Sequence, residues 1–204
     1  MNEFIVPLAG GNQMSIYEEM IREYLDDRCL IFNDEVGDNV IDDYIIHIIK
    51  WNKEDKNLPV ESRKPIKLYI TSPGGSPFSG AIMQDVILQS KTPIIGIALD
   101  LVASAAYDLF LACHQRYSFK DSCFLQHEGE IALENSRSKF KQTALFMDSR
   151  EQRVKEFILS RTNMTEEFYD EVYDQEFWLD SKRAKELGVI HGIIGEDIDF
   201  DDVI

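Results

Sequence analysis

The chain has 204 residues, and 44% of them are hydrophobic, which supports one domain with a substantial core. Its 37 acidic residues outnumber its 21 basic residues, and the net charge of −16 disfavours nucleic-acid binding, since phosphate contacts need a basic face. The three cysteines, Cys29, Cys113 and Cys123, lack metal-ligand spacing and predict reduced thiols.

No apolar run approaches the roughly 20 residues that are needed to span a bilayer. Residues 1–11 also lack the basic and apolar regions of a secretory signal. We therefore expect a cytoplasmic protein without membrane association.

Strand and helix patterns alternate along the chain, which predicts an α/β domain with a largely parallel sheet. The predicted strands are 28–32, 66–70, 93–98, 116–119, 123–126, 177–179 and 189–194. The predicted helices are 15–24, 39–51, 78–90, 104–112, 138–160, 165–172 and 181–187. Ser15 and Glu18 have the spacing of a capping box at the first helix, and Gly188 ends the last helix.

Three regions are distinguished within the chain. Residues 1–14 contain Gly10 and Gly11 and are predicted to be a flexible arm, residues 15–194 form the domain, and residues 195–204 form an acidic tail. The long helix over 138–160 carries charges on nearly every turn, so we expect it to project from the domain or to pack against another subunit.

Ser104 lies between a predicted buried strand and a predicted helix, among the small residues Ala103, Ala105 and Ala106. Small neighbours allow a substrate to approach, and the start of a helix offers free N–H groups and a positive dipole end to an oxyanion. A core serine chosen for tight packing is the alternative interpretation of this residue alone.

Two other predicted strands are followed by groups that could take part in catalysis, namely backbone N–H groups and a histidine. The strand over 66–70 is followed by Ser72, Pro73, Gly74 and Gly75, a turn whose N–H groups can face a cleft. His127 follows the strand over 123–126. Because ligands bind outside the carboxyl ends of parallel strands, these groups and Ser104 are expected to lie together.

These motifs, with Asp174-Gln-Glu-Phe-Trp-Leu-Asp-Ser181 and Ala184 to Ile190 after them, resemble the proteolytic subunit of the Clp protease. The resemblance runs from about Ile16 to Ile194 and involves four motifs in the family's order. It implies the crotonase-like ClpP fold, a stack of βαβ units. It also implies a serine peptidase that assembles into rings, as a heptamer or a double ring.

The resemblance places the nucleophile on Ser104, the base on His127 and the oxyanion donors on the backbone N–H groups of Gly75 and Ala105. The chemistry is consistent, because a serine hydroxyl needs a base, and histidine also serves as acid for the leaving amine. No zinc spacing or phosphate-binding loop is present, so we expect no cofactor. The resemblance implies that a partner AAA+ unfoldase supplies ATP-driven unfolding of the polypeptide substrates.

A carboxylate is required to orient the histidine. The family's aspartate aligns with Glu176, which is one methylene longer, and Asp174 is the alternative acid because it points to the same side of an extended chain. A solvated acidic turn without a catalytic role remains a third possibility.

Other positions depart from the family pattern. Asp100 replaces a glycine upstream of the nucleophile, Gln175 replaces an arginine of the ring–ring contact, and the segment from Glu128 to Glu134 replaces a glycine-rich strand. These changes leave open whether a double ring forms.

Two alternatives accompany the serine endopeptidase hypothesis. One is a catalytically impaired Clp-like subunit with a structural role in a mixed ring. The other is a crotonase-type enzyme acting on acyl-thioesters, although the chain shows no basic cluster for a coenzyme A phosphate.

Overall fold

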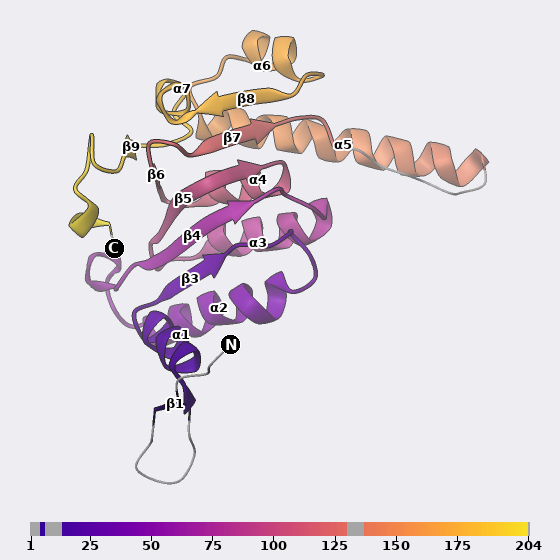
Figure 1. Ribbon diagram of the computed structural model, residues 1–204. Coiled ribbons are helices and arrows are strands. Elements are labelled where there is room, and N and C mark those ends of the chain that lie inside the picture. Colours follow the sequence, from indigo (N-terminus) through magenta and orange to yellow (C-terminus); the bar gives the residue numbers. More distant parts are fainter. Residues whose placement is uncertain (1–4, 7–13, 130–136, 204) are drawn as a thin grey trace.

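The computed structural model describes residues 5–6, 14–129 and 137–203 (Figure 1). Most of the predicted N-terminal arm lies outside these residues, but β1 (Ile5–Val6) pairs with β2 (Met14–Ser15). The capping box of α1 (Ile16–Asp26) is confirmed, because the Ser15 hydroxyl accepts from the N–H of Glu18 and the Glu18 carboxylate accepts from the N–H of Ser15.

The main sheet has seven strands in the order β3-β4-β5-β6-β9, with β7 beside the end of β5 and β8 beside β7. Their bounds are β3 Cys29–Phe32, β4 Ile66–Ser72, β5 Ile94–Ala103, β6 Gln115–Ser118, β7 Cys123–Gln126, β8 Phe177–Asp180 and β9 Gly192–Ile193. All pairs are parallel except β7 with β8. The predicted α/β fold with a mostly parallel sheet is therefore confirmed.

Strand β5 is longer than the predicted strand over 93–98, because it changes neighbour midway. Its first half pairs with β6 up to Ala98, and its second half pairs with β7 from Leu101 to Ala103. The register with β4 shifts across the same interval, where Asp100 is exposed. The change of neighbour brings β7 beside the end of β5, directly before Ser104.

Helices cover one face of the sheet (Figure 1). They are α2 (Ile46–Glu54), which continues from a π-helical turn over Ile41–Ile45, α3 (Pro77–Gln89) and α4 (Ala105–Ala112). The main core lies between this layer and the strands and includes Phe32, Ile70, Met83 and Phe110. On the opposite face, Val203 of the predicted acidic tail packs with Ile97 and Ile194.

The remaining helices are α5 (Arg137–Arg161), α6 (Glu166–Val172) and α7 (Ser181–Glu186). Figure 1 shows that the beginning of α5 extends well beyond the sheet, as expected for the long charged helix. This part of α5 exposes Phe140, Leu145 and Phe146. No described helix combines the length and apolarity needed to cross a membrane.

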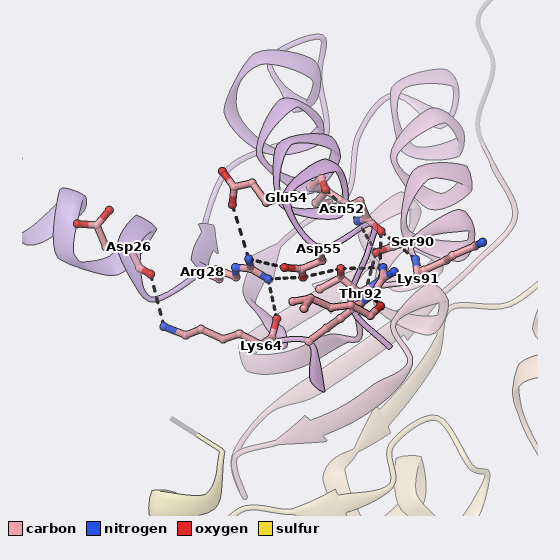
Figure 2. Close-up of polar contacts among 12 residues, drawn as sticks. Asp26, Arg28, Asn52, Glu54, Asp55, Lys64, Ser90, Lys91 and Thr92 are labelled. Carbon is pink, nitrogen blue, oxygen red and sulfur yellow. Dashed lines mark hydrogen bonds and ion pairs between the residues drawn. The ribbon is translucent and has the colours of Figure 1, made fainter. Parts of the chain in front are cut away.

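A polar network joins the amino ends of β3, β4 and β5, and in it Arg28 donates to the carbonyl of Lys64, which lies just before β4, at 3.0 Å (Figure 2). The guanidinium of Arg28, which precedes β3, donates to both carboxylate oxygens of Asp55 at 2.6 and 2.9 Å. The Thr92 hydroxyl, before β5, donates to the same carboxylate at 3.0 Å. Bidentate pairing holds the pKa of the buried Asp55 carboxyl below its usual range. The network fixes the strand starts and leaves the opposite, carboxyl ends free for a site.

Candidate active site

Ser104 has an unusual backbone conformation between β5 and α4. Its φ of 53° and ψ of −128° lie outside the regions that most residues adopt. Among the described non-glycine residues, Arg28 alone shares a positive φ. Such a conformation costs on the order of 1–3 kcal/mol and persists only where the surroundings enforce it. A strained turn from strand to helix is also how other serine hydrolases expose a nucleophile.

Two neighbouring segments hold Ser104 in this conformation. Its backbone N–H donates to the carbonyl oxygen of Leu125 in β7 at 2.9 Å. Gly74 packs against it from the β4 turn with a φ of 95°, and a Cβ at that glycine would lie 2.6 Å from the Ser104 Cβ. Only glycine therefore fits at position 74.

Gly75 and Ala105 present backbone N–H groups beside Ser104. The N–H of Val36 donates to the Gly74 carbonyl at 2.8 Å and the N–H of Ser76 donates to the Val36 carbonyl at 2.7 Å, so these bonds bracket Gly75 without using its N–H. Ala105 is the first residue of α4, where an N–H has no intrahelical partner. Donors left free in this way can stabilise an oxyanion.

A cavity of about 160 Å³ brings these groups together. Ser104, Ala105 and Gly75 line it, as does His127, which directly follows β7. Side chains from α5 and α6, among them Val154 and Tyr169, also line it. Four sequence-predicted site residues thus share one cavity. Within the described part of the chain, His127 makes no side-chain hydrogen bond or ion pair.

Neither predicted acid reaches His127 in this conformation. Gln126 pairs with Phe177 at the end of the antiparallel β7–β8 ladder, and continuing this register by one residue would set His127 opposite Glu176. The Glu176 carboxylate nevertheless accepts from the Trp178 indole N–H at 3.3 Å and is exposed. Asp174 is exposed as well, and neither residue lines the cavity.

The sequence interpretation missed Asp108, which lines the same cavity. It lies one turn into α4, and its backbone N–H donates to the Ser104 carbonyl at 3.4 Å. Burial raises the pKa of the Asp108 carboxyl to about 7. The spacing of four residues was a usable signal, because residues i and i+4 share one face of a helix.

The family model of the Clp protease matches residues 11–197. The chain belongs to the Clp protease family.

Relatives agree with this assignment. The chain is 24% identical over 184 residues to the ATP-dependent Clp protease proteolytic subunit 2 of Treponema denticola, covering 89% of each chain. It is 26% identical over 190 residues to the proteolytic subunit 3 of Streptomyces avermitilis, covering 92% of this chain and 82% of the relative. The Treponema pallidum subunit 2 is 29% identical over 139 residues, covering 67% of this chain and 70% of the relative.

A solved structure of a ClpP1 mutant from Listeria monocytogenes has the same fold, with a TM-score of 0.76. It is 21% identical and the alignment covers 91% of this chain and 99% of that one. The predicted resemblance and the ClpP fold are therefore confirmed.

Two departures from the Clp pattern are placed by the structure. Gln175 is exposed, and its side-chain amide donates to the Glu171 carbonyl at 2.9 Å. Glu128 and Gly129 lie exposed at the cavity, whereas the rest of the unusual segment, 130–134, lies outside the described residues. In the described ranges no group of three or more His, Cys, Asp or Glu side chains could hold a metal ion.

Proposed function

We propose that this Clp-family chain is a serine endopeptidase with Ser104 as nucleophile and His127 as general base. The observation that carries the proposal is the strained Ser104 turn, which opens into the same cavity as His127. The free N–H groups of Gly75 and Ala105 at that cavity support it further.

The reaction follows from these positions. His127 accepts the hydroxyl proton as the Ser104 oxygen attacks the carbonyl carbon of the scissile peptide. The N–H groups of Gly75 and Ala105 stabilise the oxyanion that forms. His127 then donates the proton to the departing amine, which leaves an ester on Ser104. Water attacks this ester with His127 again as base, and the acid product leaves.

Glu176 is proposed as the acid that orients His127. Its place directly before β8, where a continued β7–β8 register would set it opposite His127, supports this role, and rotation of its side chain away from Trp178 would free its carboxylate. Assembly with other subunits is one event that could favour the rotated side chain. Asp174 is the alternative acid.

The proposed setting is a cytoplasmic ring assembly that works with an AAA+ unfoldase on unfolded polypeptides. The names of the relatives, ATP-dependent Clp protease proteolytic subunits, support this setting. The exposed apolar side chains of α5, Phe140, Leu145 and Phe146, offer a surface for contact between subunits.

Labelling by a fluorophosphonate tests the nucleophile. The assembled full-length chain should be labelled at Ser104, and Ser104→Ala should abolish both labelling and peptide hydrolysis while the fold is retained. His127→Ala should reduce hydrolysis almost as far, because members of a catalytic group act as a unit. Peptidase activity that survives in Ser104→Ala would refute the serine mechanism.

A catalytically impaired subunit in a mixed ring is the second candidate. The exposed Glu176, engaged by Trp178, is the observation that favours it. This candidate predicts that the chain alone is neither labelled nor active, and that it co-purifies with a second, active Clp subunit.

A further inference from the structure

Asp108 has a carboxylate with no partner in the wall of the cavity beside Ser104. Among the described residues, it accepts no side-chain hydrogen bond and forms no ion pair within 4.0 Å. Among the described residues that line the cavity, the one arginine is Arg150, which is already engaged, since it donates to the Pro77 carbonyl at 3.0 Å and lies 4.6 Å from the Phe78 ring centroid. The charge of Asp108 is therefore left uncompensated.

Tyr169 provides a second unpartnered polar group at the same cavity. Its side chain is 2% exposed, and its hydroxyl has no hydrogen-bond partner among the described residues. Both residues line the same cavity, and the pKa of Tyr169 is raised to about 12 by burial and, to a lesser degree, by the charge of Asp108. Buried polar groups without partners are rare and indicate a missing ligand or water.

The position of these groups relative to Ser104 identifies the part of the substrate that they would meet. Asp108 is one helical turn beyond the nucleophile, and its N–H donates to the Ser104 carbonyl. The side chain nearest to an attacked carbonyl belongs to the residue on the acyl side of the scissile bond. A cavity of about 160 Å³ can receive such a side chain, since a cavity of roughly 150 Å³ holds a benzene molecule.

The charged residues that line the cavity favour the binding of a cationic group. Within the described lining, Glu128 and Glu151 accompany Asp108, against the engaged guanidinium of Arg150. A buried carboxylate at the base of a specificity pocket selects basic side chains in another serine peptidase. We propose that Asp108 and Tyr169 form a subsite for a lysine or arginine side chain on the acyl side of the scissile bond.

This inference rests on the proposed peptidase function, and the test separates the two. Matched fluorogenic peptides with lysine or leucine before the scissile bond are compared on the assembled full-length protein. Lysine should be preferred by at least about tenfold. Asp108→Asn should lower kcat/KM for the lysine peptide by at least about 30-fold and leave the leucine peptide within about threefold, because breaking a buried charge pair mainly affects the basic substrate.

Two further variants control the comparison. Asp85→Asn removes the same charge from an exposed position on α3 outside the cavity and should leave the preference unchanged. Asp108→Leu replaces the carboxylate with apolar surface and should reverse the preference towards leucine. A wild-type preference for leucine, or an equal loss of both substrates in Asp108→Asn, would overturn the inference.

Binding of benzamidine, a soluble cation, gives a readout that does not need the nucleophile. Calorimetry on Ser104→Ala should detect binding that is lost in Ser104→Ala/Asp108→Asn. If fluorophosphonate fails to label the wild type but this pattern holds, the peptidase proposal fails and the cation subsite stands. Absence of benzamidine binding in Ser104→Ala would overturn the subsite itself.

Discussion

Arg116 and Arg161 donate to the same two carbonyl oxygens, those of Leu111 and Cys113 at the end of α4. The distances are 3.3 and 3.1 Å from Arg116 and 2.9 and 2.7 Å from Arg161. Free carbonyls at a helix C-terminus attract cations, which offsets the repulsion between the two guanidinium groups. Because Arg161 is the last residue of α5, these hydrogen bonds join α5, which lines the cavity, to the end of α4, the helix that begins beside Ser104.

Replacing Arg116 should destabilise the protein strongly. Its side chain is 3% exposed and also donates to the carbonyls of Val189, Gly188 and Arg161. Arg116→Met leaves several buried carbonyls without donors, so the free energy of unfolding should fall by about 3 kcal/mol or more. The exposed Arg153→Met should change it by no more than about 0.5 kcal/mol in the same urea titration. Equal effects of the two variants would contradict the role of the carbonyl network.

Gly74→Ala should damage activity more than stability. The added Cβ would press on the Ser104 Cβ and the Ala103 carbonyl oxygen, and a displacement of about 1 Å at a reacting group can cost roughly 10²-fold in rate. Gly195→Ala is the matched control, because Gly195 also has a positive φ, but among the described residues no atom beyond its chain neighbours lies within 4 Å of the added Cβ. It should strain the backbone without affecting peptide hydrolysis. Full activity of Gly74→Ala would show that Ser104 is not held by this contact.

The acid is tested by paired substitutions. If Glu176 orients His127, Glu176→Gln should lower kcat by up to about 10⁴-fold, as an Asp→Asn change does in another Ser-His-Asp enzyme, and Asp174→Asn should have little effect. The opposite pattern would assign the role to Asp174. Trp178→Phe removes the indole donor that holds Glu176, so turnover should be maintained or increased. If neither carboxamide variant changes kcat, the site works as a dyad.

Substrate preference should depend on pH through Asp108. Its carboxyl is raised to a pKa of about 7 by burial, so the charge that attracts a basic side chain develops as the pH rises through about 7. The ratio of kcat/KM for lysine over leucine peptides should therefore increase between pH 6 and pH 8, because ionisation of His127 affects both substrates and cancels in the ratio. The ionisable groups lining the cavity with Asp108 are His127, Glu128, Arg150, Glu151, Tyr169 and Tyr173.

In Asp108→Asn this ratio should be independent of pH. Glu151→Gln, which removes another carboxylate from the cavity lining, should leave the change near pH 7 in place. A pH dependence that persists in Asp108→Asn would assign it to one of the other groups.

Assembly should be sensitive to salt. Gln175 cannot make the bidentate charged contact of an arginine, so we expect a single ring, or a double ring that dissociates at high ionic strength, in sedimentation velocity. Phe146→Asp on the exposed part of α5 should weaken the association of subunits further. A double ring that resists salt would show that other contacts replace the arginine, and a monodisperse monomer would contradict the ring assembly.

The sequence predicted the order and type of most elements, because they depend on local chemistry. The capping box at Ser15 was predicted from two residues and is present. The last strand was predicted over 189–194, but β9 covers only Gly192–Ile193. The N–H of Val189 donates to the Ala184 carbonyl at 2.8 Å, a local bond at the end of α7, and its own carbonyl accepts from the distant Arg116, so neither group joins the ladder. Local pattern carries no information on the Arg116 partner.

The candidate site likewise has one part that the sequence predicts and another part that it does not. Gly75, Ser104, Ala105 and His127 follow or end strands, and the rule that carboxyl ends of parallel strands meet at one edge places them together from sequence alone. The tertiary structure decided the rest: side chains of α5 and α6 line the cavity around Asp108, whose carboxyl has its pKa raised by burial, whereas Glu176, directly before β8, stays exposed with Trp178 as partner. The physical reason is that desolvation of a carboxylate depends on segments that are far apart in the chain, whereas strand ends and helix starts are fixed by the backbone within a few residues.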